Sequence, residues 1–182
     1  MHKLLLSLAV ALLTQCAGCK TKDPFPNPPP TDPLSQLPAE TQTGQRTFGC
    51  LLNGQSWTQA GNPFGGPSLA AEWYKNRLSI SCNRVFNNAN GSLNTNQSIE
   101  FAIDPIAGPG NYQLNDSKQN ILMFSDYLTN CQYITGNNQV ATVQITRWDP
   151  VARIVSGRFA FTLETPNCSK ITVTDGRFDC RF

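Results

Sequence analysis

The chain has 182 residues, of which only 14% are charged, and its formal net charge is +2. This length is enough for one domain with additional segments. The chain has 14 Lys and Arg against 12 Asp and Glu with no basic block, which argues against nucleic-acid binding, because that activity depends on clustered basic residues.

The N-terminus has the pattern of a bacterial lipoprotein export signal. A basic start precedes an apolar run over residues 4–13, and the small residues Ala17 and Gly18 directly precede Cys19. The apolar run is about half as long as a bilayer span requires, and small residues before the cysteine fit a cleavage site. We therefore expect residues 1–18 to be removed and lipid on Cys19 to attach the chain to the bacterial cell envelope. The outer membrane is favoured, and the face of that membrane stays open.

A proline-rich linker is expected over residues 19–45. Residues 20–45 contain seven prolines and few apolar side chains. Such a segment cannot bury enough apolar surface to offset the entropy lost on ordering. We therefore expect a disordered spacer, followed by a domain over residues 46–182.

From residue 46 onward, apolar and polar residues alternate in short runs separated by turn signals. The first half predicts two hairpins, one joining residues 47–53 to 55–58 through Asn53-Gly54 and one joining 69–74 to 77–84 through Lys75-Asn76. A polar loop is expected over residues 86–96, followed by a strand over residues 98–103. The domain therefore begins as a series of antiparallel strands.

The C-terminal third shows the same alternation more clearly. Strands are expected over residues 140–148 and 155–163, separated by the strand-breaking Asp149-Pro150. Residues 171–174 and 177–182 flank Asp175-Gly176, and a two-residue turn there would place both apolar faces on the same side. The pattern predicts an all-β domain, a single antiparallel β-sandwich or barrel after the disordered linker.

Five cysteines lie beyond the export signal, and in an oxidising compartment some of them should pair. Because five is odd, at least one thiol stays unpaired within the chain. The polar, Asn-flanked positions of Cys131 and Cys168 favour a disulfide between these two. Cys180 alternates with phenylalanines and is expected to face a core. The alternative is that all five are small buried hydrophobic residues.

Three segments resemble a family of uncharacterised lipoproteins from Bacteroidetes-type bacteria. They are TQTGQRTFGCLLNGQSW at residues 41–57, the strand pair at 140–163, and ITVTDGRFDCRF at 171–182. The opening Thr-Phe-Gly-Cys and the closing Thr-Asp-Gly-Arg-Phe-Asp carry the resemblance. It implies a small β domain on a lipid anchor, and it implies no activity.

Several catalytic chemistries lack their residues. The only histidine, His2, is removed with the signal peptide, which excludes histidine-dependent triads and histidine-ligated zinc in the mature chain. The domain has no C-x-x-C and no phosphate-binding glycine loop. Carboxylates remain, and Asp175 with Asp179 is the densest pair for a glycoside hydrolase. The simpler interpretation is that Asp175 is a turn residue and that Asp179 faces water, ion-paired to the neighbouring arginines.

Exposed aromatic rings offer the best candidates for ligand binding. Trp148 falls on the polar side of its predicted strand, and Trp73 and Trp57 are further candidates. We expect no metal, no cofactor and no catalytic residue. The function expected is non-enzymatic binding or scaffolding at the envelope, with a glycan, a peptide or an envelope protein as partner. A lipocalin-like carrier of a small apolar ligand and a carboxylate-based glycoside hydrolase are the alternatives.

Overall fold

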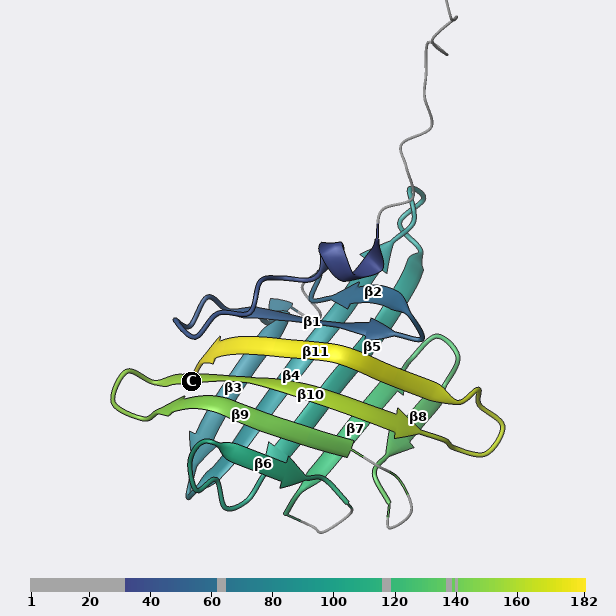
Figure 1. Cartoon of the computed structure of the whole chain (residues 1–182). Helices are drawn as coiled ribbons and strands as arrows, with labels where there is room; N and C mark the ends of the chain where they lie inside the picture. The colour runs from purple at the N-terminus through teal and green to yellow at the C-terminus, as the bar shows by residue number, and fades with distance from the viewer. Residues whose placement is uncertain (1–31, 62–64, 116–118, 137–138, 140) are drawn as a thin grey trace, which may run out of the picture. The chain divides into compact units, whose positions relative to one another are not determined.

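The three-dimensional structure is a computed structural model that describes residues 32–61, 65–115, 119–136, 139 and 141–182. The expected signal peptide, Cys19 and the first part of the linker lie outside these residues. Within this part of the chain, the strands form two separate antiparallel sheets whose strands cross each other (Figure 1). The fold is therefore an antiparallel β-sandwich, as the alternating pattern predicts. No helix among the described residues is both long enough and apolar enough to cross a membrane.

The first sheet has the order β2-β1-β11-β10-β9-β6, and the second has the order β3-β4-β5-β7-β8. The strands of the first sheet are β1 (Thr47–Leu52), β2 (Gln55–Thr58), β6 (Gly110–Gln113), β9 (Ala141–Asp149), β10 (Ile154–Leu163) and β11 (Ile171–Arg181). The strands of the second sheet are β3 (Leu69–Tyr74), β4 (Arg77–Asn87), β5 (Leu93–Ile103), β7 (Ile121–Asp126) and β8 (Cys131–Ile134).

Turn residues determine the two hairpins of the first half as expected. Asn53 and Gly54 have φ angles of 48° and 78°, and Lys75 and Asn76 have φ angles of 48° and 67°. Two consecutive left-handed residues match the right-handed twist of the flanking strands. The polar loop expected at residues 86–96 is shorter than predicted, because β4 continues to Asn87 and β5 begins at Leu93.

The hairpin predicted at Asp175-Gly176 is wrong, because β11 is one continuous strand over this region. Its pairing with β10 shifts register between Phe159 and Phe161, which leaves an extra residue in β11. Asp175 has φ 54°, as the bulge requires. A bulge changes the alternation by one residue just as a two-residue turn would. Both arrangements therefore explain why apolar residues precede and follow Asp175 on one face.

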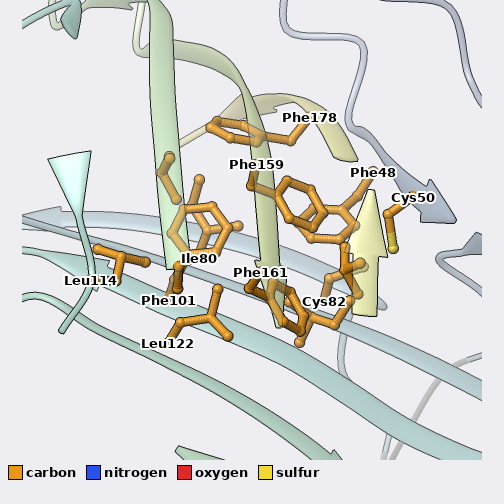
Figure 2. Packing of buried hydrophobic residues seen from close by; sticks show 14 of the residues in the cluster. Phe48, Cys50, Ile80, Cys82, Phe101, Leu114, Leu122, Phe159, Phe161 and Phe178 are labelled. Carbon is orange, nitrogen blue, oxygen red and sulfur yellow. The ribbon is translucent and has the colours of Figure 1, made fainter. Parts of the chain in front are cut away.

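The interior between the two sheets is filled by aromatic and aliphatic side chains (Figure 2). Phe159 lies at the centre, with ring centroids 4.8 Å from Phe48, 6.0 Å from Phe101 and 6.4 Å from Phe178. Rings at these separations contribute dispersion and quadrupole energy in addition to the area they bury. The close packing of this interior favours a solid sandwich over the carrier cavity that a lipocalin-like function needs.

The compact unit begins at Asp32 and not at the expected position 46. Residues 33–36 form the 3₁₀-helix η1 (Pro33–Gln36), which begins with the Asp32 carboxylate accepting from the Leu34 N–H. The following residues 38–46, here called the strap, lie against the outer face of the first sheet. Pro38 contacts the sheet so closely that a Cβ on Gly49 would be 2.7 Å from its Cδ. Part of the predicted linker is therefore structural.

Candidate functional site

Two of the three tryptophans predicted to bind a ligand lie together at one end of the sandwich. The indole of Trp148 stacks on Phe182 with centroids 5.0 Å apart, and Trp73 stands edge-on to both, at 5.5 Å and 6.0 Å. Trp73 remains 42% exposed, so this aromatic cluster is in contact with solvent. Trp73 comes from the second sheet and the other two residues from the first.

Trp148 belongs to this cluster because of a bulge in β9. The pairing of β9 with β10 shifts between Ser156 and Gly157, which leaves Thr146 as an extra residue. After the shift, Trp148 pairs with the fully buried Val155 and shares its inward direction. The sequence pattern places Trp148 on the polar face, and this is wrong because one extra residue reverses the facing of those that follow.

The expectation that Trp57 presents an exposed ring is also wrong. Its side chain is 2% exposed and forms part of the core, and its indole N–H donates to Gln97 Oε1 at 2.9 Å. Trp57 pairs with the buried Cys50 of β1 and faces inward with it. A buried indole with its N–H satisfied is a packing residue.

A cleft with a volume of about 320 Å³ lies beside the aromatic cluster. It is lined by Leu69–Glu72 of β3, by Cys180–Phe182 at the end of β11, and by Pro67, Arg46 and Arg153. Three arginines therefore surround one hollow, with Glu72 as the only acidic residue among the lining side chains.

None of these three arginines makes an ion pair with a residue that the structure describes. Arg181 donates to the carbonyl oxygens of Gly44 and Thr43, both at 3.3 Å. The side chains of Arg46 and Arg153 are exposed and donate no hydrogen bond within the described part of the chain. The cleft therefore carries positive charge that the domain does not neutralise, next to an apolar aromatic surface.

The larger groove on the outer face of the first sheet differs in this respect. It has a volume of about 710 Å³ and is lined by polar side chains, including Arg158 and Arg177. Arg158 is paired with Glu40 of the strap at 2.6 Å, and Arg177 donates to the carbonyl of Pro38 at 3.4 Å. One of these charges is neutralised by the strap, whereas Arg177, like Arg181 of the cleft, donates only to strap carbonyl oxygens.

Asp179, expected to face water between Arg177 and Arg181, is instead 1% exposed. The alternation of β11 does place it on the outer face, but the strap covers it. Its carboxylate accepts from the backbone N–H groups of Thr43, Gly44 and Gln45 at 2.8–3.0 Å. The hydroxyls of Thr41 and Ser156 donate to it at 2.6 Å and 2.7 Å.

These five hydrogen bonds determine the ionisation of Asp179. Burial alone would raise the pKa of this carboxyl, but the hydrogen bonds, above all that from the Gln45 N–H, lower the pKa from 3.8 to about 2. An ionised carboxylate with both oxygens occupied cannot exchange protons with a substrate. Asp175 lies exposed at the bulge, so the two carboxylates have different surroundings.

The five cysteines that the structure describes separate into one disulfide and three thiols. The predicted disulfide Cys131–Cys168 is confirmed and connects β8 to the loop before β11. Cys50, Cys82 and Cys180 are free and buried, as expected for Cys180. Burial raises the pKa of each thiol, to about 12 for Cys50 and Cys180. Within the described residues, no group of three or more His, Cys, Asp or Glu side chains is placed to hold a metal ion.

Sequence reasoning misses the three arginines of the cleft and Phe182. These residues come from the strap, the β9–β10 turn and the end of β11, far apart in the chain. The only local signal is conformational, since Arg46 and Arg153 occupy left-handed positions with φ angles of 58° and 55°. Comparison of the chain with protein-family models, with curated proteins and with solved structures gives no match.

Proposed function

We propose that this chain is an exported lipoprotein whose β-sandwich domain binds a partner at the bacterial envelope, without catalysis. The export signal before Cys19 supports the location, and lipid on that cysteine would hold the domain to the membrane. The disulfide Cys131–Cys168 fits an oxidising compartment outside the cytoplasm.

The observation that carries the binding role is the charged cleft beside the aromatic cluster. Desolvated aromatic side chains and arginines are the residues that most often dominate binding energy at interfaces. Here three arginines without an ion-pair partner among the described residues lie beside a cluster of three aromatic rings, and these residues come from separate segments of the chain.

The anchor is tested with Cys19→Ser and cell fractionation. Wild-type protein should sediment with membranes and the variant should not. If the variant still sediments, lipid on Cys19 is not what holds the chain.

The binding role is tested by screening glycan and peptide arrays with the wild-type chain and with Arg153→Gln and Trp73→Ala variants. Both variants should lose any bound ligand. Lys170→Gln is the matched control, because Lys170 lies next to the opposite end of β11 and pairs with Glu164 at 2.8 Å. A ligand bound equally well by all four proteins would contradict the proposed site.

A further inference from the structure

The open edge of the second sheet suggests how a partner would bind. Strands at sheet edges carry unpaired backbone groups, which proteins normally cover, shorten or charge. Three of the four edges are protected in these ways. Ser56 of β2 is hydrogen-bonded to Gln36 of η1, and β6 and β8 have only four residues each.

The fourth edge, β3, lacks such protection among the described residues. It has six residues, one charge and no proline, and it ends at the exposed Trp73 and Tyr74. Four consecutive residues of β3 line the cleft, so the cleft runs along the edge of the strand and not across one face.

The hairpin turn determines which backbone groups of β3 point into the cleft. A two-residue turn makes Tyr74 and Arg77 a hydrogen-bonded pair, and the same parity is seen where Asn83 N–H donates to the Ser68 carbonyl at 2.7 Å. Leu69, Ala71 and Trp73 alternate with the residues that are hydrogen-bonded to β4. Their own N–H and C=O groups therefore point away from β4. No described residue forms a hydrogen bond with these backbone groups.

We propose that β3 accepts an extended, acidic segment of a partner protein as an additional strand. Strand addition gives hydrogen-bond partners to the free backbone groups of β3. It also brings every second side chain of the added strand into contact with the same surface. Alternate side chains of the added strand would face Arg46, Arg153 and Arg181, and carboxylates pair with arginines in charge-assisted hydrogen bonds. An apolar side chain at the end of the segment would contact Trp73. This inference rests on the proposed binding role and assigns the partner's chemistry.

Other occupants fit less well. A second copy paired through β3 would bring two sets of three unpaired arginines together, which electrostatic repulsion opposes. The chain's own residues 20–31 contain five prolines and two lysines, so they can neither donate a regular ladder of hydrogen bonds nor complement the arginines.

The test uses the full chain in detergent micelles and a synthetic heptapeptide, acetylated and amidated, in which glutamate alternates with valine. Binding is followed by tryptophan fluorescence, and hydrogen exchange is measured at the amides of Leu69, Ala71 and Trp73. One control peptide carries glutamine in place of glutamate. A second has the glutamate sequence with alternate backbone nitrogens methylated, which removes the donors but keeps the charge.

We expect the glutamate peptide to slow exchange at these three amides by about tenfold or more, because each gains a hydrogen-bond partner. The Arg153→Gln variant should bind it about fivefold or more weakly, and Lys170→Gln should bind it as wild type does. Both control peptides should bind more weakly than the parent peptide.

Binding of the glutamate peptide without slowed exchange would overturn strand addition, and equal binding of the glutamine peptide would overturn the acidic partner. Slowed exchange that depends on protein concentration, without peptide, would identify a second copy as the occupant. If the peptide does not bind but tetragalacturonate, an acidic sugar, quenches the tryptophan fluorescence of the wild type and not of Trp73→Ala, the inference fails and the proposed binding role stands. If neither probe changes the fluorescence or the exchange, and the arrays show no ligand dependent on Arg153, both the inference and the proposed binding role fail.

Discussion

The Asp179 carboxylate should be the strongest single polar contribution to the stability of the domain. It is buried, accepts five hydrogen bonds, and joins the strap to β11 and β10. Its pKa is about 2 in the folded chain, against a usual value of 3.8. That difference corresponds to about 2 kcal/mol of stability at neutral pH.

The sign of the pH dependence follows from the lowered pKa. The folded chain releases the proton of Asp179 more readily than the unfolded chain does, so the stabilisation is fully present above about pH 5. It is lost as the pH falls through 3.8 toward about 2, where Asp179 becomes protonated in the folded chain as well. Asp179→Asn should remove this dependence, because the amide does not titrate in that range.

We expect Asp179→Asn to lower the free energy of unfolding at pH 7 by about 2–4 kcal/mol, because the amide NH₂ faces donors and leaves some of them unsatisfied. Urea unfolding followed by tryptophan fluorescence at pH 7, 4 and 2.5 measures both effects. The matched control is Asp175→Asn, an exposed residue for which we expect a change within about 0.5 kcal/mol. A wild-type advantage that is under 0.5 kcal/mol at pH 7, or that is undiminished at pH 2.5, would refute this reasoning.

Three further expectations concern stability and reactivity. Replacing Cys131 and Cys168 together by serine should lower the free energy of unfolding by about 3–4 kcal/mol in urea under non-reducing conditions, because the disulfide closes a loop across a sequence separation of 37. Gly157→Ala should lower the free energy of unfolding by about 2–3 kcal/mol in the same assay, since its Cβ would lie 2.3 Å from the Gln144 carbonyl oxygen. Gly136→Ala is the control and should be neutral, because a Cβ there would have no atom within 4 Å. The three buried thiols should resist iodoacetamide at pH 8 in the folded domain and react in denaturant, as mass spectrometry would show; labelling without denaturant would contradict their burial.

The local pattern of this chain predicts most of its strands, since alternation and turn chemistry act over a few residues. The hairpins at Asn53-Gly54 and Lys75-Asn76 form because asparagine, glycine and, here, lysine accept left-handed geometry at adjacent positions. The alternation also places Cys180 in the core and Asp179 on the opposite face. The choice of Cys131 with Cys168 depended on little more than their polar surroundings.

Bulges account for the errors near the candidate site. One extra residue in β9 turns Trp148 inward, and one in β11 imitates a hairpin at Asp175. The same period-two pattern is compatible with a bulge, a turn or a change of face, so the residues themselves do not distinguish these alternatives. Only pairing with the neighbouring strand decides between them.

The amino-acid sequence alone determined that this is an all-β domain, because backbone preferences and hydrophobic alternation are local. Tertiary structure decided that the strap covers Asp179, that Trp57 is buried, and that three arginines from distant segments surround the edge of β3. Those arrangements depend on which surfaces meet when the two sheets and the strap pack, and packing is a property of residues far apart in the chain.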